Sequence, residues 1–298
     1  MSTPIDDRRM LVADGSRVVM RNRDWSALYD AQGQMRWSDH PAGIPRNRWD
    51  PQAYEAAVVA TCARIRANRV GRILIDELAR RVTIIPFARH GAGNAFAHSG
   101  YTRGGLAPGE RMRYCMNRAS TPFDDTGRPI PNTPRGTGRG SATWVEFTPG
   151  GWSGVTAPGP GPWADEVLMH ELVHALATTQ GASSCRAAGF NYDTFDEYVA
   201  IAVTNVYCSH YRRPVRDSHQ DRGPRPARVG QQRIDAEDEM MRDLYWLMGN
   251  FCDRLANLPE SYASYNPFRD AAARGVIPRV TLATGGRPRI SARQRVGR

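Results

Sequence analysis

Residues 164–180 most constrain what this chain can fold into. They contain no proline or glycine, and apolar residues surround a short polar motif, His-Glu-Leu-Val-His, at 170–174. Pro162 precedes this segment and Gly181 follows it, at the places where helices commonly begin and end. The pattern therefore predicts a half-buried helix over 164–180. Two histidines and a glutamate on such an apolar helix are costly to bury unless another group satisfies them.

The spacing within the motif indicates what that other group is. His170 and His174 are one turn plus a residue apart, so both imidazoles leave the same face of a helix and can bind one metal ion. Glu171 is displaced by about 100° around the helix axis, where its carboxylate can reach a water molecule on the metal without binding the metal itself. The motif therefore predicts a Zn²⁺ site with His170 and His174 as ligands and Glu171 as the catalytic base.

A catalytic zinc ion usually has three protein ligands and one open position, so the chain should supply another ligand downstream. Residues 193–207 predict a second helix, with acidic residues in its first turn and an apolar body behind them. Glu197 is the preferred third ligand, because it follows His174 by 23 positions and the small Ala200 would allow the two helices to approach closely.

Other assignments stay open at this point. Asp196 or Asp193 could be the third ligand instead, or Asp196 and Glu197 could merely complement the helix dipole. Hydrolysis would also need a donor that stabilises the oxyanion. The sequence does not choose among the candidates for that role, which are Tyr192, Tyr198, His210 and His219.

These residues resemble the gluzincin branch of zinc metallopeptidases, in which HExxH supplies two ligands and a glutamate on the next helix supplies the third. The resemblance implies that His170, His174 and Glu197 bind zinc and that Glu171 is the base. One position departs from it, because many gluzincins have an aspartate four residues after the third ligand and this chain has Ile201. The group that orients a ligand histidine must then come from elsewhere.

A wider pattern over residues 55–210 is similar to the NleD-type effector metallopeptidases that bacteria deliver into other cells. It consists of the segment Gly71-Arg-Ile-Leu-Ile-Asp-Glu-Leu, the following Val82-Thr-Ile-Ile-Pro, the HExxH helix and the acidic start at 196–197. The resemblance implies an α+β, zincin-like fold, in which a small sheet packs on the active-site helix and a ligand-bearing helix follows. It also implies that the substrate is a protein or peptide and that host or competitor-cell proteins are the targets.

Length and composition allow a sizeable domain. A hydrophobic content of 41% in 298 residues is enough for a core. We expect a lead-in segment at 1–50, a metallopeptidase domain at 51–270 with a mostly helical C-terminal part, and a basic, disordered tail at 271–298. The mean hydropathy of −0.54 argues against a membrane span.

Charge and targeting features bear on where the protein acts. The first thirty residues lack the apolar region of a secretory signal, so we expect cytoplasmic synthesis and delivery by a specialised secretion system. All 40 cationic residues are arginines, a bias that suits a GC-rich genome and also a protein that escapes ubiquitination on lysine. The net charge of +10 keeps two alternatives open: a nucleic-acid-associated protease, or a basic binding protein whose metal is structural.

Secondary structure outside the motif is expected as follows. Residues 51–81 predict one long helix or two that join near Asn68 and Gly71, and 234–258 predict a further helix with an apolar, methionine-rich core face. Strands are expected at 82–87 and 141–147. The second is either an ordinary paired strand or the cleft edge to which a substrate adds, with Trp144, Glu146 and Gly150 as contacts.

The composition of residues 88–141 and the placing of the cysteines lead to two further predictions. Residues 88–141 are rich in glycine, arginine and proline, which predicts a functional loop or a partly disordered segment. The five cysteines are scattered and form no CxxC pair, so we expect them to be reduced and mostly buried.

Overall fold

The computed structural model of the protein describes residues 9–11, 18–21, 26–29, 35–38, 51–78, 82–85, 95–99, 143–147, 149, 163–184, 186–190, 192–219, 225–226 and 229–279. Within these ranges no helix is both long and apolar enough to cross a membrane. Most of 88–141 and of the predicted tail at 271–298 lies outside the described residues.

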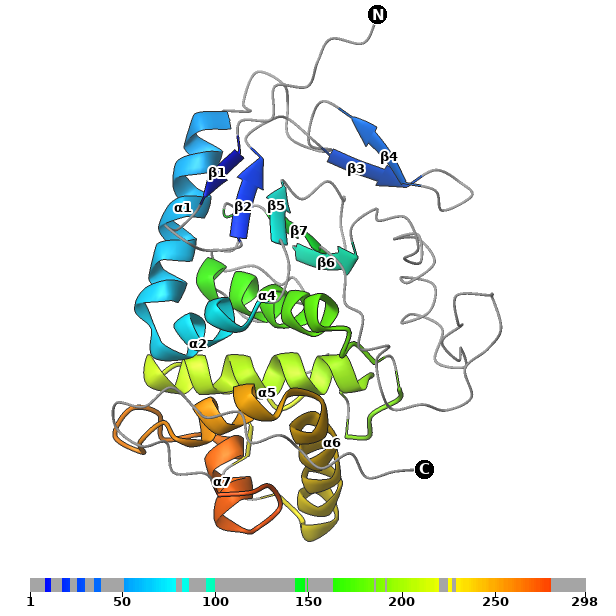
Figure 1. Ribbon diagram of the computed structural model, residues 1–298, viewed down its shortest axis with the longest axis vertical. Helices are drawn as coiled ribbons and strands as arrows, with labels where there is room; N and C mark the ends of the chain where they lie inside the picture. Colours follow the sequence, from blue (N-terminus) through cyan, green and yellow to red (C-terminus); the bar gives the residue numbers. More distant parts are fainter. Residues whose placement is uncertain are drawn as a thin grey trace, which may run out of the picture.

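A mixed five-stranded sheet forms one layer of the molecule, at the top of Figure 1, and a separate two-stranded hairpin lies beside it. The strands are β1 (Arg9–Leu11), β2 (Val18–Arg21), β3 (Ser26–Tyr29), β4 (Met35–Ser38), β5 (Val82–Ile85), β6 (Ala95–Ser99) and β7 (Thr143–Phe147). The sheet has the order β1-β2-β5-β7-β6. Its central strand β5 pairs in parallel with β2 and β7, and the outer strands β1 and β6 are antiparallel to their neighbours.

The centre of the sheet is apolar on account of β5 and β7. Val82, Ile84, Val145 and Phe147 are completely buried, as expected for β-branched and aromatic residues in strands with covered faces. The predicted strands at 82–87 and 141–147 are therefore confirmed. The strand at 141–147 was expected to be either an ordinary paired strand or the edge of a cleft, and its pairing shows that it is an ordinary paired strand.

The idea that residues 141–147 form the cleft edge is wrong, because β7 pairs with β5 on one side and β6 on the other. No main-chain groups remain on β7 for a substrate strand. The outer position belongs to β6, which lies within the segment that we predicted to be a loop. The N-terminal region also contributes to this sheet, since Val18–Met20 of β2 pair with Val82–Ile84 of β5.

Helices form the remaining layers. Their bounds are α1 (Pro51–Ala67), α2 (Arg69–Glu77), α4 (Ala164–Gln180), α5 (Phe195–His210), α6 (Gln231–Ala256) and α7 (Pro267–Ala273). Figure 1 shows α4 directly beneath the sheet, α5 beneath α4, and α6 and α7 at the far end. The helix α4 contacts β6 and β7 on one side and α5 on the other, so it is the central element of the fold.

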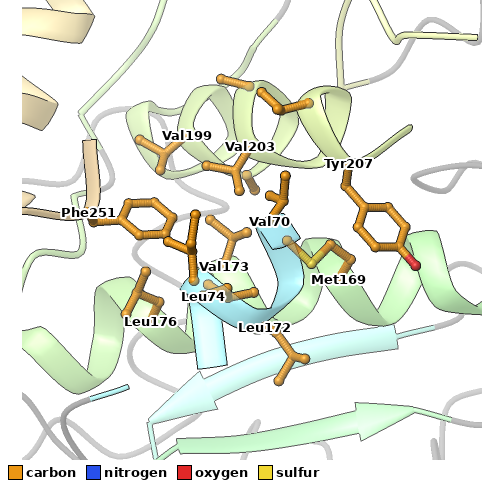
Figure 2. Packing of buried hydrophobic residues seen from close by; sticks show 14 of the residues in the cluster. Val70, Leu74, Met169, Leu172, Val173, Leu176, Val199, Val203, Tyr207 and Phe251 are labelled. Carbon is orange, nitrogen blue, oxygen red and sulfur yellow. The ribbon is translucent and has the colours of Figure 1, made fainter. Parts of the chain in front are cut away.

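The helix α4 has the bounds that the sequence predicts, and its sequence explains its central place. Asp165 and Glu166 lie in its first turn, and Gly181 ends it in the left-handed conformation with φ 70°. A helix with apolar residues all around is buried on every side. In Figure 2, Leu172 points toward the strands, whereas Val173 points toward the α5 side of the core.

The helix α6 contributes the other large part of the core. Its buried apolar residues follow the predicted methionine-rich face, which is therefore confirmed as core. They are Met240, Met241, Leu244, Met248, Phe251, Cys252 and Leu255.

The predicted helical region 51–81 consists of two helices, and Asn68 separates them. The side chain of Asn68 accepts a hydrogen bond from the backbone N–H of Val70 (2.8 Å), which caps the start of α2. The chain turns sharply here, so Gly71 packs against the end of α1. A Cβ atom at Gly71 would lie 2.1 Å from the carbonyl oxygen of Ile65.

This close approach predicts a large effect of a small change. We expect Gly71→Ala to lower the free energy of unfolding by about 2 kcal/mol, because overpacking costs about 3 kcal/mol and the better helix propensity of alanine returns about 1. Urea unfolding measures the difference. Gly189→Ala is the matched control, since nothing lies within 4 Å of a Cβ there. A Gly71→Ala variant as stable as the wild type would contradict the packing described.

Candidate metal centre

Two histidines on α4 face each other across one helical turn. His170 is 3% exposed and His174 is half-buried. Their ring centroids are 4.8 Å apart and their Nε2 atoms are 3.1 Å apart. The helix therefore directs both imidazoles to one point, as the spacing in the sequence predicts.

Glu197 reaches the same point from α5. Its Oε2 lies 3.2 Å from Nε2 of His170, and its Oε1 lies 3.4 Å from Nε2 of His174. The first turn of α5 is fixed by Thr194, whose hydroxyl oxygen accepts the backbone N–H of Glu197 at 3.2 Å. The three residues offer ligand atoms that all lie within 4.8 Å of one another, and together they could hold a metal ion.

The separations fit zinc. Zn–N and Zn–O bonds of about 2.0–2.1 Å in a tetrahedral site place neighbouring ligand atoms about 3.3 Å apart. The three separations in this group are 3.1, 3.2 and 3.4 Å. Oε2 of Glu197 is buried and accepts no hydrogen bond from the described residues, so a cation is the kind of partner that would satisfy it.

The charges of the group are strongly coupled. Burial lowers the pKa of His170 to about 3, against the opposing effect of Glu197. Burial also disfavours the charged form of His174, but the carboxylates of Glu197 and Glu171 outweigh it and raise its pKa to about 9. The imidazoles hold the pKa of Glu197 well below its usual value, although burial alone would raise it. Metal ligands must be deprotonated, so metal binding would release any proton that this group carries.

Glu171 lies beside the group rather than in it. It follows His170 on α4 and is 7% exposed, and its carboxylate is close enough to His174 to raise the pKa of that residue. This is the position that the helix geometry predicts for a base that does not bind the metal.

The alternative ligands Asp193 and Asp196 are engaged elsewhere. The carboxylate of Asp196 accepts the backbone N–H of Ser184 at 2.7 Å. Asp193 pairs with His219, with 2.6 Å between Oδ2 and Nδ1. Neither joins the group of residues that could hold a metal ion.

One of the four candidate oxyanion donors lies at the metal group. Nε2 of His219 is 3.6 Å from Oε2 of Glu197, and the side chain is 40% exposed. The other three are held elsewhere: the hydroxyl of Tyr192 donates to the Glu237 carboxylate, that of Tyr198 to the Glu237 carbonyl, and Nδ1 of His210 is hydrogen-bonded to the carbonyl of Tyr262.

Sequence reasoning missed Arg216. It is 7% exposed, and its Nη2 donates to the carbonyl oxygen of His219 at 2.7 Å. Burial lowers its pKa, while the carboxylates of Glu197 and Glu166 act in the opposite direction. This places a buried positive charge close to the candidate ligand Glu197. Nothing in the arginine-rich sequence around position 216 distinguishes this residue from its neighbours.

The described cysteines do not belong to the site. Cys62, Cys208 and Cys252 are buried and form no disulfide, which confirms the prediction for these three; Cys115 and Cys185 lie outside the described residues. Burial raises the pKa of the Cys62 thiol to about 12 and that of Cys208 well above its ordinary value. Neither thiol joins the metal-binding group.

A buried carboxyl group one turn before His170 makes stability depend on pH. Burial raises the pKa of Glu166 from 4.5 to about 7, against the effect of Arg213 and Arg216. Between pH 4.5 and 7 the folded state therefore holds a proton that the unfolded state has lost, so stability falls as pH rises through this window.

We expect metal-free Glu166→Gln to exceed the wild type in free energy of unfolding by about 3 kcal/mol at pH 8, because the amide carries no charge to bury. At pH 4 the two should be equal. Urea unfolding at both pH values measures the difference. A wild type that is as stable as the variant at pH 8 would contradict the raised pKa.

No protein-family model and no curated protein sequence matches this chain. Among solved structures, the catalytic domain of Clostridium botulinum neurotoxin serotype F is similar, with a TM-score of 0.33 and 13% sequence identity; the match covers 91% of this chain and 73% of that chain.

Proposed function

We propose that this protein is a zinc-dependent endopeptidase with a zincin-like fold. One observation carries the proposal: two imidazoles from α4 and a carboxylate from α5 converge at zinc-ligand separations, with Glu171 beside them. Structural zinc sites are usually closed by four protein ligands, whereas catalytic sites have three. In the described part of the chain the metal-binding group has three members, which favours a catalytic site over a structural one.

His170, His174 and Glu197 would hold the zinc ion. When bound, zinc supplies Lewis acidity, which favours loss of a proton from a water molecule near neutral pH and polarises a carbonyl group. Glu171 accepts the proton of the attacking water and passes it to the leaving amine. Asp193 pairs with Nδ1 of His219, and Nε2 of the same ring would donate to the oxyanion that develops on the substrate.

The gluzincin resemblance is incomplete at Ile201, which is buried in the apolar core. In keeping with this, Nδ1 of His170 has no hydrogen-bond partner among the described residues. Asp193 is a carboxylate outside the metal group that pairs with a histidine, His219. It orients the donor that we assign to the oxyanion rather than a metal ligand.

The sheet suggests how a substrate would bind. The strand β6 is the outer strand of the described sheet on the side where α4 contacts it. No described strand pairs with the outer edge of β6, so an extended peptide could pair with that edge by main-chain hydrogen bonds and lie along the active-site helix. We therefore propose a protein or peptide substrate bound as an added strand. Nothing in the described residues specifically favours nucleic acid.

We propose further that the protein acts on proteins of a target cell after specialised secretion. The support is compositional: a chain without lysine offers no lysine side chain for ubiquitination. The target cell is then a eukaryotic host or a competing bacterium, and cleavage in extracts of the two kinds of cell distinguishes them.

The test is a search for new protein termini. Zinc-loaded protein is incubated with an extract of eukaryotic cells and, separately, with an extract of bacteria, and new N-termini are identified by mass spectrometry. We expect defined cleavage sites in one extract that disappear with a zinc chelator and return when zinc is restored. If no zinc-dependent terminus appears in either extract, the proposal of an endopeptidase is wrong.

A further inference from the structure

His219 is carried by a segment without regular secondary structure, so its position needs a separate explanation. The helix α5 ends at His210, and Arg212 turns the chain with φ 56°. Residues 213–219 then run back to the metal group, where Nε2 of His219 lies 3.6 Å from Glu197. Main-chain hydrogen bonds hold the first part of this segment, from the N–H of Arg213 to the carbonyl of Cys208 (3.0 Å) and from the N–H of Arg225 to the carbonyl of Val215 (2.7 Å). Side chains hold the part that leads to His219.

The first attachment comes from α5. Asn205 is 2% exposed and binds the backbone of Arg216 through both ends of its amide group. Its Nδ2 donates to the carbonyl of Arg216 and its Oδ1 accepts the N–H of Arg216, each at 2.8 Å. This pair of hydrogen bonds fixes the middle of the segment against the helix that bears Glu197.

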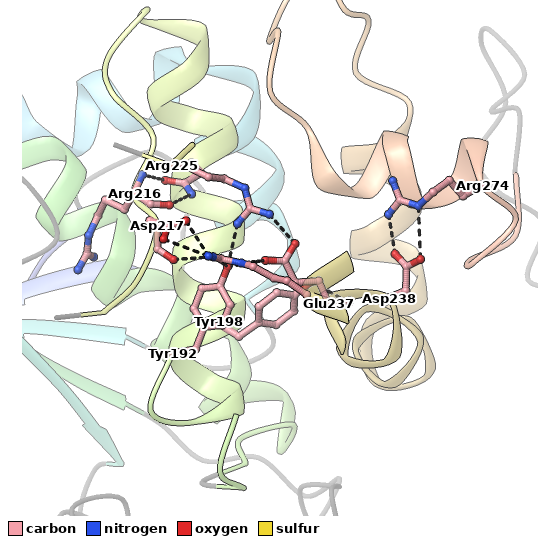
Figure 3. Close-up of polar contacts among 10 residues, drawn as sticks. Tyr192, Tyr198, Arg216, Asp217, Arg225, Glu237, Asp238 and Arg274 are labelled. Carbon is pink, nitrogen blue, oxygen red and sulfur yellow. Dashed lines mark hydrogen bonds and ion pairs between the residues drawn. The ribbon is translucent and has the colours of Figure 1, made fainter. Parts of the chain in front are cut away.

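The second attachment comes from α6, and Figure 3 labels two of the residues that take part in it, Asp217 and Glu237. Nη2 of Arg233 donates to the backbone carbonyl of Asp217 at 2.8 Å, and Nη1 donates to its carboxylate at 3.0 Å. Nε of the same guanidinium donates to Glu237 at 2.9 Å. Glu237 also accepts from Nη2 of Arg225 at 2.6 Å. The guanidinium of Arg233 thus binds two carboxylates, those of Glu237 and Asp217, and these contacts restrict the movement of its long side chain.

The same network reaches the partner of His219. The hydroxyl of Tyr192 donates to Glu237 at 2.8 Å and accepts from Nη2 of Arg233 at 2.9 Å. Tyr192 directly precedes Asp193, and Asp217 lies two residues before His219. Arg233 therefore contacts a neighbour of each member of the Asp193–His219 pair, and Glu237 contacts the neighbour of Asp193.

We propose that Arg233 and Glu237 are positioning residues that set the Asp193–His219 pair beside the metal group. The role of His219 depends on the proposed function, whereas the attachment itself does not. Both α6 residues act through other side chains and lie outside the set of metal ligands. Their loss should displace His219 and leave His170, His174 and Glu197 in place.

The first arm of the test uses metal-free protein. Hydrogen–deuterium exchange is compared for wild type, Arg233→Gln and Glu237→Gln, with Arg274→Gln as the matched control. Arg274 also forms an ion pair with α6, but with Asp238 on a face away from Tyr192 and Asp217, as Figure 3 shows. We expect the amides of residues 213–219 to exchange at least about tenfold faster in the first two variants only. Unchanged exchange in this segment overturns the proposal, whether or not the protein is an enzyme.

The second arm is a double-mutant cycle on the zinc-loaded protein, with the peptide around the strongest cleavage site found in the cell extracts as substrate. Arg233→Gln should lower kcat about tenfold with little change in KM or zinc content. Arg233→Lys should restore only part of it, because an ammonium lacks the planar set of donors with which Arg233 binds Glu237 and Asp217. In a His219→Ala background, Arg233→Gln should have no further effect. Equal losses in both backgrounds would show a general structural role and overturn the proposal.

The two arms separate this inference from the proposed function. If Glu171→Gln is fully active, the function proposed above fails while the exchange data still decide the attachment. If Glu171→Gln is inactive but Arg233→Gln lowers kcat by the same factor with and without His219, only the positioning role fails.

Discussion

Replacing Glu171 by glutamine is expected to lower kcat for peptide hydrolysis by about a thousandfold, while the protein keeps its zinc. The amide has nearly the shape of the carboxylate but cannot accept a proton from water. The metal-binding group contains His170, His174 and Glu197 but not Glu171, so metal affinity should change little. Steady-state kinetics and zinc analysis on the same preparation measure both quantities.

The matched control for this variant is Glu166→Gln. Glu166 is also a buried glutamate on α4, but it has no assigned part in catalysis, so its variant should hydrolyse the same substrate at close to the wild-type rate. A Glu171→Gln protein that retained a large part of the wild-type kcat would eliminate the proposed base. Loss of zinc from that variant would instead assign Glu171 to the metal.

Replacing Glu197 by alanine should weaken zinc binding by at least about a hundredfold, because it removes one of three protein ligands and the only anionic one. The affinity is measured by competition with a chromogenic chelator at fixed pH. The control is Asp196→Asn, which keeps an acceptor for the N–H of Ser184 and should bind zinc as the wild type does.

Unchanged zinc affinity in Glu197→Ala would mean that another residue is the third ligand. His219 would then be the first candidate, since among the described residues its Nε2 is the further histidine nitrogen at the group, 3.6 Å from the Glu197 carboxylate. Reduced affinity in Asp196→Asn, with normal affinity in Glu197→Ala, would move the assignment to Asp196.

The elements nearest the motif could be predicted because their patterns are local. The helix over 164–180 follows from an uninterrupted apolar segment between Pro162 and Gly181, and the convergence of His170 with His174 follows from helical spacing. The meeting of Glu197 with these histidines was predictable in outline, because an acidic first turn on the next helix is a recognisable pattern. These features depend on periodicity and on the ends of helices, which a single sequence contains.

The features that the sequence did not predict depend on contacts between distant segments. The outer strand β6 lies in a glycine-rich stretch that has no period-two pattern, and its pairing with β7 makes it the outer strand of the described sheet. Asp193 and His219 are joined only because a segment without helix or strand turns back to α5. Arg216 is one arginine among many, and its burial has no local signal.

The central claim is that one zinc ion binds between α4 and α5, and a crystal of the zinc-loaded protein measured at the zinc absorption edge tests it most directly. We predict one anomalous peak within bonding distance of Nε2 of His170, Nε2 of His174 and the carboxylate of Glu197, with one coordination position left to solvent. A peak at any other place, or no peak together with imidazoles that point away from each other, would contradict the claim.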